Sequence, residues 1–376
     1  MMFTNDTPIK LTKDDFLGRT RFAEQLGESL STWKEEESLV VALYGEWGSG
    51  KSSVINLTKN WLGKDTSKDT PTVFEFNPWI YSGGDNIEEK FFNGLARKFS
   101  FEPDTESDRQ ISEKLRLYSK ALDLIPNTSS TQSVIKYLLM IIGVVGISSS
   151  SLLSFVNSSK YVQIGVLAIG LFVFIVSFIK SLLQRIADIF DSRVQVNQKT
   201  FKQLKEEIHK ELENRSKKLI IIIDDIDRLL PSEMREIFKL IRVNADFPNT
   251  IYLLAFDRRV VERNLEQCSD ISGPDFLEKI VQVSFDIPYA KHEKIIQFLL
   301  RELDRVLDSL PSSADNYFDK PEWENIFHSG YKDYFHTIRD VKRYVSSLEF
   351  NIYLMQQKGS MEVNPMDFIA IEAVRV

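Results

Sequence analysis

Residues 45–53 read GEWGSGKSS and directly follow the apolar run SLVVALY at 38–44. The loop fits the pattern G-x-x-x-x-G-K-[ST], in which a glycine-rich turn surrounds a phosphate group. Residues 53–62 continue as SVINLTKNWL, with apolar side chains spaced to share one side of a helix. A buried strand, this loop and a helix in direct succession distinguish a phosphate loop from a chance match. The stretch therefore predicts an α/β fold with a phosphate site.

Each part of this loop has an expected role toward a bound phosphate. The glycines let backbone N–H groups turn inward, and the N-terminus of the following helix adds a partial positive charge. Lys51 is expected to reach the β- and γ-phosphates, and the Ser52 hydroxyl to bind Mg²⁺. The residues expected to contact the nucleotide are Gly45, Gly48, Ser49, Gly50, Lys51, Ser52 and Ser53.

Acidic residues follow the run LIIII at 219–223, which is typical of a strand buried on both faces of a parallel sheet. Phosphoryl transfer needs carboxylates at the end of a neighbouring strand, to hold magnesium and to position the attacking water. We expect Asp224 to bind the magnesium and Asp225 to polarise the water, although the two assignments are interchangeable on sequence alone. Both join Lys51 as expected catalytic residues. Asp227 and Arg228 are equally consistent with an ion pair and with a catalytic role.

A further apolar strand is expected at 250–256, TIYLLAF, and Asp257 stands at its tip. In related ATPases a polar residue at this place senses the γ-phosphate, so Asp257 is a sensor candidate. An arginine near a subunit edge is able to act on the nucleotide of a neighbouring subunit, but a surface ion pair is at least as frequent. The arginine candidates are Arg228, Arg242, Arg258 and Arg259.

The order of strands and helices predicts a doubly wound, mostly parallel sheet with its ligand at the carboxyl ends of the strands. Residues 73–76 supply another strand, and residues 201–212 read as an amphipathic connecting helix. The chain from His292 onward is expected to form a helical subdomain. Its aromatic stripe at four-residue steps predicts helix core rather than a base-stacking surface, and comprises Trp323, Phe327, Tyr331 and Phe335.

Two uncharged apolar runs lie between the phosphate loop and the acidic strand, at 137–156 and 161–179. Each approaches the about 20 residues that a helix needs to cross a bilayer. A buried helical hairpin or an interfacial dimerisation hairpin is the alternative, but neither run carries a polar stripe of helical period. We therefore expect a transmembrane hairpin. The segment between the two runs carries a single positive charge, Lys160. The outer flanks carry more: Lys136, Lys180, Arg185 and Arg193. This bias predicts two passes through the membrane with both ends of the chain in the cytoplasm.

Composition excludes several other classes of protein. The chain has 376 residues, of which 43% are hydrophobic and 27% charged, so a sizeable core is available. The single cysteine, Cys268, allows no internal disulfide and indicates a reducing compartment. The formal net charge of −7 argues against direct nucleic-acid binding. The histidines at 292, 328 and 336 have no carboxylate or cysteine at ligand spacing, so no metal beyond Mg²⁺ is expected.

The chain resembles the KAP P-loop NTPases. The resemblance rests on DFLGR at 15–19, the phosphate loop, FNPW at 76–79 and IIIIDDIDR at 220–228, with support from ADFPNTIYLLAFDR at 245–258 and IRDVKRY at 338–344. Two membrane helices inserted in the NTPase core are also similar to many members. The resemblance implies a P-loop ATPase of the additional-strand class, with ATP and Mg²⁺ as cofactors, on the inner face of a membrane. Members include bacterial proteins of phage exclusion and defence and animal signalling scaffolds. It also suggests that Arg339 approaches the nucleotide from a helical lid.

Four segments are expected on these grounds. Residues 1–130 and 186–290 form the two parts of the NTPase domain, 131–185 the hairpin, and 291–376 a helical lid whose apolar end at 368–376 is typical of a helix cut short. The expected function is a membrane-anchored ATPase switch in anti-phage defence, and its partners are the lipid bilayer with other copies of the chain or other proteins. The alternative is a membrane scaffold that binds ATP for structure and hardly turns it over. A transporter ATPase subunit is disfavoured because no LSGGQ-like signature lies between the two nucleotide motifs.

Overall fold

The computed structural model describes residues 7–33, 37–64, 70–84, 86–101, 106–123, 201–267, 272–308, 319–355 and 363–375. The expected transmembrane hairpin at 131–185 lies outside the described residues. Among the helices of the described part, none has the length and apolar character needed to cross a membrane.

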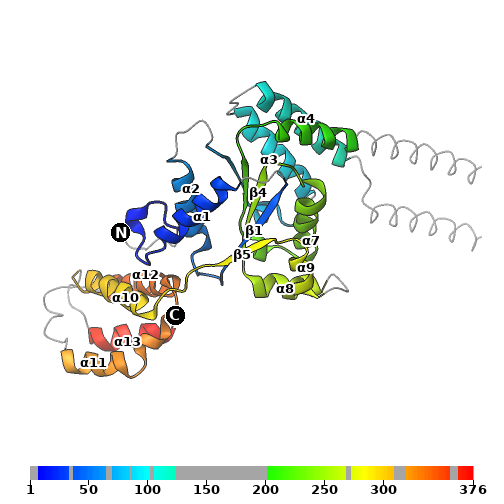
Figure 1. Ribbon diagram of the computed structural model, residues 1–376. Helices are drawn as coiled ribbons and strands as arrows, with labels where there is room; N and C mark the ends of the chain where they lie inside the picture. The colour runs from blue at the N-terminus through cyan, green and yellow to red at the C-terminus, as the bar shows by residue number, and fades with distance from the viewer. Residues whose placement is uncertain are drawn as a thin grey trace, which may run out of the picture. The chain divides into compact units, whose positions relative to one another are not determined.

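A five-stranded parallel sheet forms the centre of the nucleotide-binding region (Figure 1). Its spatial order is β2-β3-β4-β1-β5. The strands are β1 (Leu39–Tyr44), β2 (Thr72–Phe76), β3 (Leu219–Ile223), β4 (Thr250–Phe256) and β5 (Val283–Asp286). The parallel α/β sheet predicted from the sequence is therefore confirmed. Strand β4 lies between β1 and β3, so one additional strand separates the strand before the phosphate loop from the acidic strand.

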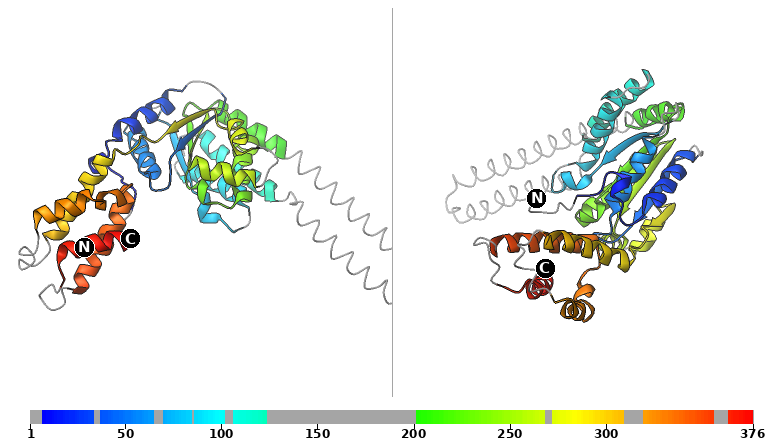
Figure 2. Two further views of the ribbon diagram at one scale, coloured as in Figure 1. Left: turned by 90° about the horizontal axis from the view of Figure 1, so that it is seen from below. Right: turned by 90° about the vertical axis from the view of Figure 1, so that its left-hand side faces the viewer.

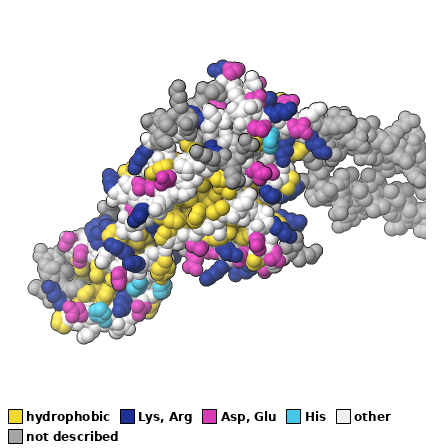
Figure 3. Space-filling model, in the orientation of Figure 1, with side chains coloured by type: hydrophobic (Ala, Val, Ile, Leu, Met, Phe, Trp, Pro, Cys, Tyr) yellow, Lys and Arg dark blue, Asp and Glu magenta, His cyan; other side chains and the backbone are white. Residues whose placement is uncertain are grey.

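Burial of the strands follows from their place in the sheet. Every residue of β3 and β4 is buried, which accounts for their unbroken aliphatic sequences. Strand β5, which the sequence analysis did not expect, is an exposed edge strand with the mixed sequence VSFD. Figure 3 shows hydrophobic side chains gathered over the region of β1 and β5, and Val283 and Phe285 are both more than a third exposed. A four-residue strand with one open edge gives too weak a pattern to recognise in advance.

Helices cover both faces of the sheet (Figures 1 and 2). On one face, α1 (Thr20–Thr32) and α2 (Lys51–Leu62) pack against Val41, Ile220 and Leu253 of the strands. The opposite face carries α7 (Pro231–Lys239), α8 (Arg258–Glu266) and α9 (Gly273–Glu278). The chain after α7 continues as a π-helical turn, Leu240–Asn244, labelled η5. Such two-sided cover is the doubly wound arrangement that the element order predicts.

The described residues between Glu88 and Asn214 belong to a second compact unit, distinct from the unit that holds the sheet. Its described helices are α3 (Ile87–Phe101), α4 (Glu106–Asp123) and the segment 201–213. Tyr118 of α4 lies at its centre, with ring centroids 4.8 Å from Phe92 and 4.4 Å from Phe201. Ile208 and Leu212 are fully buried, so the predicted amphipathic helix is confirmed.

The end of the chain forms the expected helical subdomain. Its helices are α10 (His292–Leu307), α11 (Lys320–His328), α12 (Ile338–Met355) and α13 (Pro365–Arg375). They pack around a core in which the Tyr331 hydroxyl donates to the Tyr344 hydroxyl at 2.8 Å. Four short 3₁₀ helices complete the described elements: η1 (Thr12–Asp14), η2 (Pro78–Tyr81), η4 (Ile226–Arg228) and η7 (Tyr331–Tyr334).

Candidate nucleotide site

The glycine-rich loop turns from the end of β1 into α2 at the carboxyl edge of the sheet. Gly48 and Gly50 have φ angles of +80° and +93°, which side-chain-bearing residues adopt only with strain. At Gly45, a Cβ atom would lie 2.5 Å from Ser49 Oγ and 3.0 Å from Ile287 Cδ1, so a larger residue would have to displace these side chains. The Gly45 N–H donates to the Phe256 carbonyl at 3.3 Å and anchors the loop to β4.

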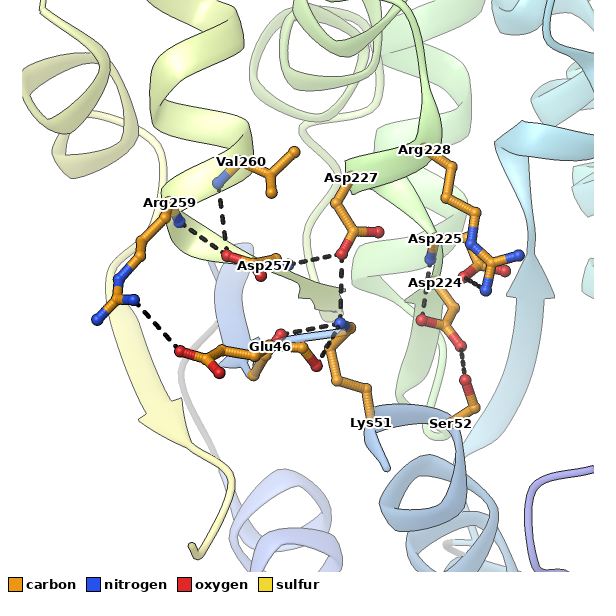
Figure 4. Close-up of polar contacts among 11 residues, drawn as sticks. Glu46, Lys51, Ser52, Asp224, Asp225, Asp227, Arg228, Asp257, Arg259 and Val260 are labelled. Carbon is orange, nitrogen blue, oxygen red and sulfur yellow. Dashed lines mark hydrogen bonds and ion pairs between the residues drawn. The ribbon is translucent and has the colours of Figure 1, made fainter. Parts of the chain in front are cut away.

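Lys51 is buried inside this loop (Figure 4). Its Nζ donates to the Gly45 carbonyl at 2.8 Å and lies 3.2 Å from Asp227 Oδ2. The same Asp227 oxygen accepts the backbone N–H of Asp257 at 2.9 Å. Of the two roles open to Asp227, the structure therefore has the ion pair, and it is made with the lysine of the phosphate loop.

Ser52 and Asp224 join the phosphate loop to the acidic strand. The Ser52 hydroxyl donates to Asp224 Oδ2 at 2.6 Å, although the residues are 172 positions apart. Burial raises the pKa of the Asp224 carboxyl, and the negative charge of Asp225 adds to the rise, while the Ser52 hydrogen bond opposes it. A buried carboxylate beside a second carboxylate and a hydroxyl offers the oxygen ligands that Mg²⁺ prefers. The donor set therefore fits magnesium.

Asp225 has different surroundings from its neighbour. Its φ of +62° is unusual for a residue with a side chain. Oδ2 accepts the Asn77 side-chain amide at 2.8 Å, and Oδ1 lies 2.7 Å from the Arg228 guanidinium. Arg228 in turn stacks over the ring of Trp79 at 4.8 Å. Geometry thus favours Asp224 for magnesium, and Arg228 is in an ion pair.

Three of the other sensor and arginine candidates, Asp257, Arg258 and Arg259, also have partners within this chain. Asp257 is the N-cap of α8, and its side chain accepts the backbone N–H groups of Arg259 and Val260. The guanidinium of Arg258 lies 2.6 Å from Glu262, which raises the pKa of that arginine. Arg259 forms an exposed pair with Glu46 at 3.3 Å. Arg242 is exposed on the π-helical turn.

Arg339, at the start of α12, lies against the phosphate loop. Its guanidinium is 5.5 Å from the centre of the Trp47 ring, and its Cδ is 3.7 Å from the position that a Cβ on Gly48 would occupy. The loop and the start of α12 line one cavity of about 600 Å³, together with segments 14–19 and 286–290. Arg339 therefore lies beside the phosphate loop and lines the same cavity, and its approach to a nucleotide stays a prediction.

Two residues of this site have no role assigned from the sequence alone. Asn77 follows β2 directly, and a polar residue at the carboxyl end of a parallel strand is the signal that also identifies Asp224. Arg19 is buried, and its guanidinium donates to the carbonyls of Ser49 and Pro288. Only the DFLGR resemblance points to Arg19, because its partners are far away along the chain.

One family model and one known protein match most of this chain. The model of the KAP family P-loop domain matches residues 19–355. The phage T7 exclusion protein of Escherichia coli (strain K12) is 30% identical over 288 residues, which are 75% of this chain and 34% of that protein. The chain thus spans about a third of the length of this relative.

Solved structures similar to this chain include two archaeal proteins. The Aeropyrum pernix ORC2 protein, solved in ADPNP-ADP complexes, is 12% identical with a TM-score of 0.43, over 99% of this chain and 71% of that one. Cdc6p from Pyrobaculum aerophilum is 13% identical with a TM-score of 0.40, over 96% of this chain and 66% of that one. Similarity at this level carries no inference about ligands or partners.

Proposed function

This chain belongs to the KAP family of P-loop domains, and we propose that its site binds Mg-ATP and hydrolyses it to drive a conformational or assembly switch. The observation that carries the proposal is the 2.6 Å hydrogen bond between Ser52 and Asp224. It places a hydroxyl from the phosphate loop and a buried carboxylate from the neighbouring strand at one point, as a magnesium-nucleotide complex requires. By the relation to the phage T7 exclusion protein, we assign the switch to phage exclusion.

Ser52 and Asp224 would hold the magnesium ion. When bound, Mg²⁺ bridges phosphate oxygens and neutralises the charge that develops on them. Asp224 has to be ionised for this role, and burial, which raises the pKa of the carboxyl, opposes its ionisation more than Lys51 favours it. The need for a cation at this point supports the assignment.

Lys51 would pair with the phosphates. Its Nζ already lies inside the loop, bound to the Gly45 carbonyl and to Asp227, so it needs no approach from solvent. A bound triphosphate would take over the contact that Asp227 makes, because two phosphate groups outweigh one carboxylate in charge. Asp227 would then keep its hydrogen bond to the Asp257 N–H. Through this bond, the loss of the Lys51 contact would be felt at the end of β4.

Asp225 would position and polarise the attacking water. Each of its oxygens already has a partner, Asn77 on one and Arg228 on the other, and both contacts stabilise the ionised carboxylate and so weaken it as a base. The same observation favours the alternative function, a scaffold that binds ATP with little turnover. The two candidates differ in whether some event releases Asp225.

The apolar part of the cavity would receive the base. Ile9, Phe16, Leu17, Ile287 and Pro288 line it beside the phosphate loop. Apolar walls with a few polar groups are typical of nucleotide pockets, and they exclude water from the base. We therefore propose a nucleotide whose base lies toward segments 14–19 and 286–290.

Attachment to a membrane, through the apolar runs at 137–156 and 161–179, is a further part of this proposal. Lysine and arginine flank these runs, which supports a two-pass arrangement in the cytoplasmic membrane with the nucleotide site on the inner side. Assembly with other copies of the chain or with partner proteins is proposed as the output of the switch, and no direct binding of nucleic acid is proposed.

The proposal is tested by the affinity of the purified full-length chain for Mg-ATP. We expect Lys51→Ala to reduce binding at least about a hundredfold, because the lysine contributes a charge inside a buried loop. Lys59→Ala is the matched control, since Lys59 lies on the same helix but pairs with Glu75 outside the site. Equal affinity in Lys51→Ala and wild type would contradict the site. In cells, the proposal requires that Lys51→Ala abolishes phage exclusion while Lys59→Ala retains it.

A further inference from the structure

Arg19 is a buried cation that the proposed chemistry does not use. Its side chain is 6% exposed, and it stands at the N-cap of α1, at the end of segment 15–19. Burial lowers the pKa of the guanidinium, and Asp15 opposes the effect, but an arginine remains charged throughout the physiological range. Asp15 itself accepts hydrogen bonds from Gly18 and Thr20. Within the described residues, no carboxylate forms an ion pair with Arg19.

The guanidinium of Arg19 bridges two backbone carbonyls from separate parts of the fold. Nη1 donates to the Ser49 carbonyl in the phosphate loop, and Nη2 donates to the Pro288 carbonyl at 2.9 Å. Pro288 lies between β5 and α10, beside Ile287, whose N–H is bonded to the Tyr44 carbonyl at 2.9 Å. One guanidinium nitrogen of Arg19 is therefore bonded to the phosphate loop. The other is bonded to the segment after β5, which is itself hydrogen-bonded to β1.

The bond to Ser49 determines the orientation of one peptide group in the loop. In a trans peptide the carbonyl and the following N–H point in opposite directions. Because the Ser49 carbonyl faces Arg19, the Gly50 N–H faces the opposite side of the loop. Phosphate loops bind anions through inward N–H groups, so a carbonyl held outward is a condition for binding.

Gly50 leaves room for this guanidinium because it has no side chain. Its φ is +93°, and a Cβ atom at this position would lie 2.6 Å from Arg19 Nη1. The glycine therefore serves the contact with Arg19 as well as the turn itself. Segment 15–19 is further fixed by Phe16, whose ring lies 5.5 Å from that of Phe298 in α10.

We propose that Arg19 is a positioning residue for the triphosphate, which holds the Ser49–Gly50 peptide with its N–H toward the phosphates by bonding the Ser49 and Pro288 carbonyls together. The inference rests on the proposed function, since it requires that the loop binds a nucleotide. Arg19 acts through the backbone and touches no substrate. Its fork geometry matters as well as its charge, because a lysine ammonium lacks the planar pair of donors.

The test uses the purified full-length chain and two probes, Mg-ATP and Mg-tripolyphosphate, which lacks the base and sugar. We expect Arg19→Lys to weaken both probes by about tenfold or more, although the charge is kept. Arg21→Lys, on the exposed side of α1, is the matched control and should bind as wild type does. Equal affinity in Arg19→Lys and Arg21→Lys would overturn the proposal, and so would a loss confined to Mg-ATP, because Arg19 would then act on the base.

Two further measurements separate positioning from damage to the fold. In Arg19→Ala, guanidinium ion at a sub-denaturing concentration should restore binding of tripolyphosphate, with sodium chloride of equal ionic strength as the control. If Arg19→Lys does not fold, Arg19→Ala alone carries the test. Tripolyphosphate binding in Arg19→Ala that equals wild type without added guanidinium would overturn the proposal. Failure of the proposed function gives a different result: the wild type binds neither probe, or Lys51→Ala binds both probes as tightly as the wild type does.

Discussion

Asp224 and Asp225 are neighbours in the chain, but their carboxylates have different partners and belong to two parts of the site. The magnesium side comprises Lys51, Ser52 and Asp224, and its groups already face one another across the loop. The water side comprises Asn77, Asp225 and Arg228, and there each oxygen of the carboxylate is held by one partner. Under the proposed function, nucleotide binding leaves Ser52 and Asp224 where they are, whereas turnover is favoured when the partners of Asp225 are released. Binding and hydrolysis should therefore be separable by substitution.

The largest expected separation is produced by Asp225→Asn. The amide fills the same space but accepts no proton, so turnover should fall by about 10²- to 10⁴-fold, the usual contribution of a general base. Affinity for Mg-ATP should change little, because Asp225 does not contact the loop. Phosphate release and binding affinity are measured on the same preparation, beside Asp246→Asn, an acid that bonds Ser38 just before β1. Full turnover in Asp225→Asn would remove the assignment of the base.

A smaller effect is expected from Asn77→Ala, which removes one of the two partners of Asp225. A hydrogen bond of this kind contributes about 0.5–1.5 kcal/mol, so its loss should raise turnover by about two- to tenfold at unchanged affinity. Asn93→Ala, whose amide bonds Glu89 in α3, is the matched control. A fall in turnover would show that Asn77 holds Asp225 in its active position, and the contrast between the two sides would then be wrong.

The smallest effect concerns stability and pH, through Asp224→Asn. Burial raises the pKa of Asp224 in the folded chain, so its stabilising contribution is present below the ordinary carboxyl pKa and is lost as pH rises through the folded value. Without nucleotide or Mg²⁺, the variant should unfold at a slightly higher temperature than wild type near pH 8, and the gap should narrow toward about pH 5. Thermal unfolding at the two pH values measures this. A variant less stable than wild type at both pH values would contradict the view that the ionised, buried Asp224 destabilises the fold in the absence of Mg²⁺.

Patterns confined to a few consecutive residues were sufficient to predict most of the fold. The phosphate loop and the acidic strand end were both recognisable, because steric demand on glycine and complete burial restrict the residue types over a short stretch. The aromatic stripe shows the limit of such patterns. Its residues do pack into the helical core, but helix α11 ends at His328, and Tyr331 belongs to a 3₁₀ turn after Gly330, whose φ is +146°. A four-residue period alone does not reveal where the backbone leaves the helix.

The exact partners within the site depended on the tertiary structure. Asp224 and Asp225 are equivalent in the sequence, and only the order of the strands places Ser52 against one and Asn77 against the other. Asp227 was open to two roles until the structure placed Lys51 beside it.

The sequence by itself was sufficient to predict that this chain folds as a P-loop domain, and it pointed to most residues of the candidate nucleotide site, though not to Asn77 or to the contacts of Arg19. The tertiary structure alone decided how they are connected. Arg19 meets Pro288 across 269 positions and Ser52 meets Asp224 across 172, and no local pattern encodes such pairs. The physical reason is that local preferences act over a few residues, whereas a hydrogen bond between distant segments exists only after the sheet has brought the carboxyl ends of its strands to one edge.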